Sequence, residues 1–189
     1  MTEVSSLTGR LLVATPALAD PNFDRAVVLL LDHDEKGSLG VVLNRPTPVD
    51  VGDILEGWGE LAGEPGVVFQ GGPVSLDSAL GVAVIPGGPA ADGPLGWRRV
   101  HGAIGLVDLE TPPELLAAAL GSLRIFAGYA GWGPGQLQDE LTEGAWYVVE
   151  SEPGDVSATR PQGLWRAVLR RQRSELAMVA TYPDDPSLN

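Results

Sequence analysis

The sequence contains no cysteine among its 189 residues, which excludes disulfide bonds, thiolate nucleophiles, zinc–thiolate sites and iron–sulfur clusters. Basic residues are also scarce, since 12 Lys and Arg stand against 25 Asp and Glu and give a formal net charge of −13. A chain this acidic is not expected to bind nucleic acid or anionic lipid through general attraction to phosphate. With 44% apolar and 20% charged residues, the composition is that of a globular protein and not of a disordered chain.

Long hydrophobic runs are missing as well. The apolar runs reach only six residues, as in Ala26–Leu31, whereas a membrane-spanning helix requires about 20. The first nine residues lack the basic and apolar segments of a signal peptide. We therefore expect a cytoplasmic protein without membrane association, built as a single domain over 1–189 with an ordered core from about 7 to 180.

Glycine and proline, at 25 and 16 residues, separate short apolar runs instead of clustering. The sequence Asp34–Gly37 is typical of a hairpin turn. Eight runs have the length and composition of strands: Arg10–Thr15, Ala26–Asp32, Ser38–Asn44, Val67–Gln70, Ala79–Ile85, Ile104–Asp108, Leu123–Gly128 and Trp146–Glu150.

Fewer segments predict helices. The clearest is Thr111–Leu120, where Thr111 and Glu114 match a capping box and Gly121 would end the helix. Apolar spacing indicates two further helices and a short one weakened by its glycines: Gly135–Thr142, Pro161–Gln172 and Asp53–Leu61. Locally paired strands with irregularly inserted helices favour an α+β fold with a mixed or curled sheet of about eight strands.

Motifs for common chemistries are absent from the sequence. There is no G-x-S-x-G elbow, and the single lysine, Lys36, does not follow a phosphate-binding glycine loop. Asp32–Gly37 begins like a calcium loop, but Lys36 occupies a ligand position and Leu43 stands where a bidentate Glu is needed. The two histidines have no metal-ligand spacing. We expect neither a metal site nor a cofactor.

Several single residues admit two interpretations. His33 could act as an acid or base, although a strand-end histidine hydrogen-bonded at a turn is favoured. Asn44 could tie a loop through its amide, and Arg45 could clamp an anion; structural tethering is favoured for both. Gly71 and Gly72 could bring backbone N–H groups close to a ligand, or simply form a turn.

Gly128–Leu137 is the most distinctive stretch, because it places glycines between Tyr129 and Trp132 ahead of a predicted helix. One interpretation is a pocket wall with a helix N-terminus open to an anionic group. The other is a tight corner where the glycines serve packing and Trp132 fills the core. The sequence does not separate the two.

Positive charge is concentrated near the C-terminus, where residues 156–174 contain five arginines and no acid. Arg166, Arg170 and Arg173 share one face if the predicted helix continues by a turn. They could form a patch for an anion or a partner. A helix that balances surrounding carboxylates is the favoured interpretation.

In this order, these segments resemble the YqgE/AlgH family of small bacterial proteins. The resemblance is carried by Gly9–Pro16, Asp20–Phe23, Val27–His33, Gly37–Pro46, Gly71–Val74, Gly128–Glu140 and Trp146. It implies a compact α+β domain with a bent, partly barrel-like sheet, and one branch of the family has been called a transcriptional regulator. Family positions mark as candidates His33, Asn44, Gly71, Gly72, Pro73, Tyr129, Gly131, Trp132, Gln136 and Glu140.

Three functions remain open. The favoured one is a non-enzymatic module that binds a small ligand or a protein partner, because no nucleophile, base pair or metal cluster is recognisable. The second is an enzyme for a small polar or anionic substrate, with His33 as acid or base and with Asn44, Arg45, Gln136 or Glu140 binding in the same pocket. The third, a DNA-binding regulator, is opposed by the net charge. An indirect regulatory role through a protein partner fits that charge better.

Overall fold

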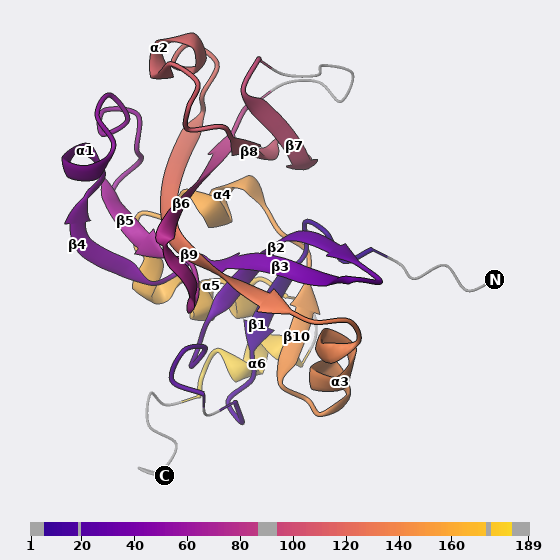
Figure 1. Ribbon diagram of the computed structural model, residues 1–189. Helices are drawn as coiled ribbons and strands as arrows, with labels where there is room; N and C mark the ends of the chain where they lie inside the picture. The colour runs from indigo at the N-terminus through magenta and orange to yellow at the C-terminus, as the bar shows by residue number, and fades with distance from the viewer. Residues whose placement is uncertain (1–5, 19, 87–93, 173–174, 183–189) are drawn as a thin grey trace.

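The computed structural model describes residues 6–18, 20–86, 94–172 and 175–182. Within them the strands form one curled sheet flanked by short helices, so the predicted α+β class with a bent sheet is confirmed (Figure 1). The main path runs β10-β1-β2-β3-β9-β6-β8-β7, and β5 pairs with β4 and, in parallel, with β9. The strands are β1 Leu11–Ala14, β2 Val27–Asp34, β3 Gly37–Val42, β4 Pro46–Asp50, β5 Val67–Gln70, β6 Val74–Val84, β7 Trp97–His101, β8 Ile104–Val107, β9 Ser122–Trp132 and β10 Trp146–Val149.

The β1–β3 part of the sheet is buried on both faces. Alternate residues of β1 enter two different apolar clusters, Leu11 and Val13 on one side and Leu12 and Ala14 on the other. Strands buried on both faces consist of continuous apolar residues instead of alternating ones, which explains the run in β2. The hairpin predicted at Asp34–Gly37 is confirmed by the β2–β3 register.

The central strand β9 is five residues longer than the predicted strand Leu123–Gly128, because the glycine-rich segment continues the sheet. Its Phe126 lies in the same cluster as β1 Leu11, whereas Ala130 and Trp132 lie in the cluster on the opposite face. The switch occurs at Gly128, which has a φ of 75°. A Cβ atom there would also lie 2.6 Å from the Gly72 carbonyl oxygen, so both conformation and space require glycine.

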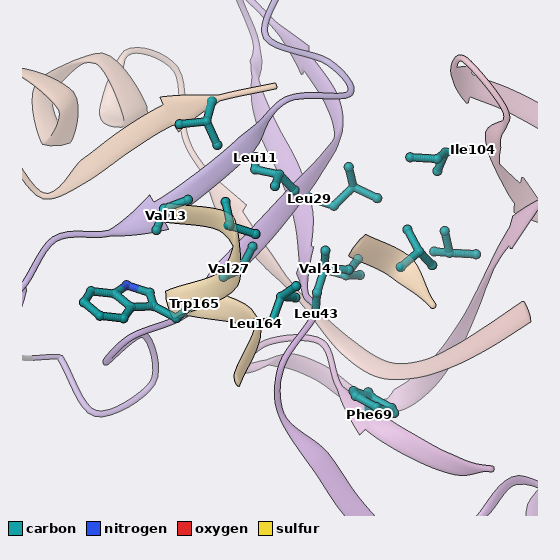
Figure 2. Packing of buried hydrophobic residues seen from close by; sticks show 14 of the residues in the cluster. Leu11, Val13, Val27, Leu29, Val41, Leu43, Phe69, Ile104, Leu164 and Trp165 are labelled. Atoms are coloured by element: carbon teal, nitrogen blue, oxygen red, sulfur yellow. The ribbon is translucent and has the colours of Figure 1, made fainter. Parts of the chain in front are cut away.

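The helices are short: α1 Val51–Ile54, α2 Pro113–Leu116, α3 Gln136–Thr142, α4 Pro153–Val156, the 3₁₀ helix η1 Pro161–Gly163, α5 Leu164–Arg170 and α6 Leu176–Val179. The predictions for α3 and for η1 with α5 are confirmed. Figure 1 places α1 and α2 at one end of the molecule and α3 at the other. Figure 2 shows Leu164 and Trp165 of α5 among side chains from β1, β2 and β3.

Two helix predictions need correction. The capping box at Thr111 is wrong, because Pro112 occupies the N-cap of α2 and no side chain caps it. The Thr111 hydroxyl oxygen instead lies only 2.4 Å from the place where a Cβ on Gly96 would be. The helix predicted over Asp53–Leu61 is wrong in extent, because α1 spans Val51–Ile54 and ends before Gly57, which has a φ of 85°.

Candidate functional site

The distinctive residues after β9 form a network around one carboxylate. The indole nitrogens of Trp132 and Trp146 donate to Glu140 Oε1 over 3.1 and 3.0 Å, and Gln136 Nε2 donates to Glu140 Oε2 over 3.0 Å. Both indoles are buried and pack against each other and against Phe23. Gln136 Oε1 also accepts from the Gly133 amide. These contacts support the packing interpretation of the Gly128–Leu137 segment.

His33 lies beside this network. Its ring is buried, with Nδ1 2.6 Å from Ser38 Oγ across the hairpin and Nε2 3.5 Å from Gln138 Nε2 on α3. The donor and acceptor roles of the two ring nitrogens in these contacts depend on the tautomer. The contacts match a histidine hydrogen-bonded at a turn.

Other candidates surround a second place, a hollow of about 210 Å³ that we call the arginine hollow. Asn44, Arg45 and Arg166, which the sequence analysis marked for different reasons, all line it. It is therefore assembled from the loop before β2, the link between β3 and β4, and η1 with α5, which are far apart in the sequence. Its lining residues are Asp24, Arg25, Asn44, Arg45, Gln162, Trp165 and Arg166.

Asn44 fixes the backbone on one side of the hollow. Its amide oxygen accepts from the Val27 N–H over 3.0 Å, and its amide nitrogen donates to the Arg25 carbonyl over 2.9 Å. Arg25 has a φ of 53°, a left-handed conformation that disfavours any residue with a Cβ by about 1–2 kcal/mol. Strained backbone of this kind is concentrated at functional sites, and here it carries a side chain of the hollow.

Guanidinium groups dominate the lining. The Arg25 guanidinium carbon lies 4.5 Å from the centroid of the Trp165 ring, and that of Arg166 lies 5.7 Å from it. The indole itself is held by a 2.8 Å hydrogen bond from Nε1 to the Ala14 carbonyl. Arg45 donates to the Asp24 carbonyl and Arg166 to the Ala180 carbonyl. Each guanidinium has five N–H donors and can therefore make several contacts at once.

A smaller hollow of about 90 Å³ shares one lining residue, Arg45, with the first. Gly72 lines this smaller hollow. Gly71 and Gly72 both lie close to the β9 backbone. A Cβ atom on Gly71 would lie 2.4 Å from the Gly128 carbonyl oxygen, and one on Gly72 would lie 2.2 Å from the Tyr129 carbonyl carbon. The close approach of the backbones therefore requires glycine at both positions, whether or not a ligand binds there. The other lining residues are Pro21, Asn22, Val42, Gln70 and Pro73.

A family model described as AlgH-like matches residues 11–177 of the sequence. The chain belongs to the AlgH-like family. It is similar to UPF0301 proteins of Streptomyces avermitilis (90% identical, covering 100% of this chain and 98% of the relative) and Streptomyces coelicolor (87%, with the same coverage).

Two solved structures extend the comparison of this AlgH-like chain to its fold. A crystal structure of a Corynebacterium diphtheriae protein has a TM-score of 0.89 at 32% identity and covers 96% of this chain and 95% of its own. The solution structure of the AlgH protein from Pseudomonas aeruginosa has a TM-score of 0.67 at 28% identity, with 97% coverage of both chains. The curled half-barrel sheet is thus the fold of the family, as the resemblance implied.

The structure separates the predicted site residues of this AlgH-like chain. Asn44, Arg45, Gly72 and Arg166 lie at the two hollows, whereas Trp132, Gln136 and Glu140 surround α3. The enzyme hypothesis places His33 in one pocket with Asn44, Arg45, Gln136 or Glu140. His33 contacts Gln138 of α3 and lines neither hollow. Tyr129 packs against the first core cluster, Gly131 is exposed in β9, Arg170 is exposed on α5, and Arg173 lies outside the described residues.

Sequence reasoning missed Arg25, Gln162 and Trp165, which complete the arginine hollow. One signal was available: Lys36 is the only lysine, so the remaining eleven basic residues are arginines. Arginine recognises anions through paired, planar donors better than lysine does.

Arg124 on β9 was also missed. Its side chain is 2% exposed and donates from Nη2 to the Glu64 and Ala158 carbonyls over 2.9 and 3.0 Å, while Nε and Nη1 have no hydrogen-bond partner in the described residues. Burial lowers the pKa of Arg124 from its usual value to about 10. It lines neither hollow, so it joins two loops and contacts no candidate site.

The described part of the chain meets neither the requirements of a metal site nor those of a membrane-spanning helix. No group of three or more metal-ligating side chains occurs there. None of the helices in those ranges has the length and apolar character needed to cross a bilayer.

Proposed function

We propose that this AlgH-like protein is a non-enzymatic module that binds a small anionic ligand in the arginine hollow. The observation that carries the proposal is the convergence of Arg25, Arg45 and Arg166 on one hollow in a chain with a net charge of −13. Against these three cations the lining holds a single carboxylate, that of Asp24. An anion placed there gains charge-assisted hydrogen bonds, which are about twice as strong as neutral ones.

The lining also supports binding without turnover. It contains no hydroxyl, imidazole or ammonium side chain among the described residues, and arginine remains protonated in ordinary conditions. Among the lining residues, only the Asp24 carboxylate belongs to the groups that act as nucleophiles or as acid–base catalysts. We expect the ligand to be released unchanged.

The arrangement of the other arginines opposes direct DNA binding. Arg171 forms a bidentate ion pair with Asp155 at 2.6 and 2.8 Å and contacts Glu152 at 3.4 Å, and Arg166 turns to the hollow. The described arginines of the C-terminal run thus do not present one continuous cationic surface to a phosphate backbone.

The test uses inorganic phosphate as the probe, with isothermal titration calorimetry of the full chain at constant ionic strength. We expect saturable binding that Arg166→Gln weakens about tenfold, because a hydrogen bond between charged groups contributes about 1.5–3 kcal/mol. Arg170→Gln is the matched control, since Arg170 is exposed on the same helix outside the hollow.

The control variant must keep the wild-type affinity. Equal weakening by both substitutions, or heat that depends only on ionic strength, would show general charge attraction and overturn the proposal. A parallel thermal-denaturation series checks the folded state, where phosphate at 100 times its Kd adds about 2.7 kcal/mol to the stability.

A further inference from the structure

We infer that the end of the molecule that carries α1 and α2 (Figure 1) docks a basic, amphipathic segment of a protein partner. Three exposed apolar side chains, Ile54, Leu95 and Leu115, belong to this end together with a set of carboxylates, and we call the whole set the acidic–apolar surface. None of the three apolar residues lines the arginine hollow, so this inference is independent of the proposed function.

Two of the apolar side chains come from helices that the fold brings together. Ile54 is the last residue of α1 and Leu115 lies in α2, and they are 53% and 58% exposed. The loop after α1 contacts α2, because a Cβ atom on Gly57 would lie 3.2 Å from Pro113 Cγ. Each of the two helices also has one buried residue in the same core cluster. Ile54 and Leu115 are therefore the large apolar side chains that this packing leaves uncovered.

Leu95 adds a third apolar side chain and is 84% exposed. It precedes Gly96, whose carbonyl accepts from the Asp108 N–H over 2.7 Å. A Cβ atom on Gly96 would lie 2.4 Å from Thr111 Oγ1, one residue before the N-cap of α2. Exposed apolar groups that gather in this way, with polar residues at their rim, mark interaction surfaces.

The rim of the acidic–apolar surface is negatively charged. Residues 46–66 contain five Asp and Glu and residues 102–121 contain three, and neither segment contains Lys, Arg or His. All eight carboxylates are exposed, and none forms an ion pair within the described ranges. With Arg98 and Arg99 of β7 and Arg124 of β9 included, the formal charge is still −5. The eight carboxylates are those of Asp50, Asp53, Glu56, Glu60, Glu64, Asp108, Glu110 and Glu114.

This charge decides which occupant fits. Nucleic acid and anionic lipid carry the same sign as the surface and are repelled by it. A second copy that docked with the same face about a two-fold axis would bring two sets of carboxylates together. A segment with Lys and Arg on one side and apolar side chains on the other would pair with the rim and cover Ile54, Leu95 and Leu115. The surface therefore fits a basic, amphipathic segment of another protein.

The probe is a fluorescein-labelled peptide of about 18 residues, or five helical turns, with leucine on one face and lysine on the other. Its binding to the full chain is followed by fluorescence anisotropy. We expect saturable binding that weakens as NaCl rises from about 50 to about 300 mM, because salt screens exposed charges. A scrambled peptide of the same composition, without an apolar face, and a peptide with glutamate in place of lysine should each bind at least about tenfold more weakly.

Variants at exposed apolar positions locate the binding on the molecule. Ile54→Ser combined with Leu115→Ser should weaken binding about tenfold, because the peptide then has less apolar area to cover. The matched control is Leu76→Ser combined with Met178→Ser, since these side chains are 53% and 72% exposed and lie in β6 and α6. The control should bind the peptide as wild type does, and thermal denaturation checks that both variants are folded.

Variants at exposed carboxylates test the rim. Glu56→Gln combined with Glu114→Gln removes two negative charges from the surface and should weaken binding about fivefold. Glu35→Gln combined with Glu143→Gln removes the same charge from exposed positions in the β2–β3 turn and after α3. This control should change the affinity by less than about twofold.

Equal weakening by either pair of substitutions and its control would show general attraction to an acidic protein and overturn the inference. Equal binding of the scrambled peptide would do the same. If analytical ultracentrifugation shows a dimer that Ile54→Ser with Leu115→Ser dissociates, the surface binds a second copy and the inference is wrong. None of these results bears on phosphate binding at the arginine hollow, so the two proposals fail separately.

Discussion

Glu140 holds the indole nitrogens of Trp132 and Trp146 through a single oxygen. Replacement by leucine leaves two buried N–H groups without an acceptor, each at a cost of about 1–3 kcal/mol. We predict that Glu140→Leu lowers the free energy of unfolding by about 2–5 kcal/mol, measured by urea denaturation. Glu140→Gln retains an acceptor oxygen of the same shape and should cost about 1 kcal/mol. Equal losses in the two variants would contradict this account of the network.

Arg124 provides a prediction about pH. Its pKa is lowered to about 10 by burial, so the folded chain binds this proton more weakly than the unfolded chain does. The buried charge opposes folding below pH 10, and that penalty is relieved as the pH rises above about 10 towards the usual pKa of arginine.

We therefore expect the stability of wild type relative to Arg124→Met, which does not titrate, to increase between pH 8 and pH 11. Chemical denaturation of both proteins at each pH measures the difference, in which the titration of shared groups cancels. A difference that is constant over this interval, or that falls, would show that the Arg124 cation is not destabilised by burial.

Among the strands and helices, the bend in β9 has the strictest residue requirement, which is glycine at position 128. Gly128→Ala combines a left-handed φ with a Cβ only 2.6 Å from a backbone oxygen, and we expect a loss of about 3–5 kcal/mol from strain and overpacking together. Gly144 is the matched control, because it has a φ of 79° but open space where an added Cβ would lie. Gly144→Ala should cost about 1–2 kcal/mol in the same denaturation experiment, and a similar cost at both positions would contradict the argument from space.

The join between α4 and α5 depends on a buried carboxylate. Asp155 is 3% exposed and pairs with Arg171, and its hydrogen bond raises the pKa of that arginine above its usual value. Arg171→Leu leaves this carboxylate unpaired, which costs about 3 kcal/mol. Arg10→Leu breaks the exposed pair with Glu150 and should cost less than about 1 kcal/mol. Thermal unfolding of the two variants tests the ranking, which a larger loss in Arg10→Leu would reverse.

The local sequence pattern predicted those strands and helices whose own residues form an apolar run or an amphipathic face. The apolar runs of β1, β2 and β3 and the amphipathic spacing of α3 and α5 were sufficient. β4 and β7 were missed because neither contains an apolar run. β4 is interrupted by Pro46 and Pro48. β7 contains the polar residues Arg98, Arg99 and His101. Their strand conformation comes from pairing with β5 and β8, which a local pattern cannot reveal.

Across the whole molecule, the sequence marked members of the arginine hollow but not the hollow itself. Asn44 and Arg45 follow a predicted strand, and Arg166 lies in a predicted helix about 120 residues later. Their meeting depends on how α5 packs against β1–β3. The backbone at Arg25 is held by Asn44, which donates to the Arg25 carbonyl and accepts from the Val27 N–H. No residue pattern near Arg25 predicts its positive φ.

The distribution of charge over the molecule determines how an anion can be recognised at the arginine hollow. A strongly acidic molecule repels small anions at long range, so an anion site in it must rely on close, directed donors. Three guanidinium groups against one carboxylate provide them. Arg98 and Arg170 do not line the hollow, so they report whether an anion is recognised there or merely attracted to positive charge anywhere on the surface.

The most direct measurement is therefore an NMR titration that follows the side-chain Nε–H signals of the eleven arginines as inorganic phosphate is added. We predict saturable shifts with one common Kd for Arg25, Arg45 and Arg166, while Arg98 and Arg170 show only the small linear change that added salt produces. Shifts spread evenly over all arginines, or no saturation at Arg25, Arg45 and Arg166, would contradict an anion site in the arginine hollow.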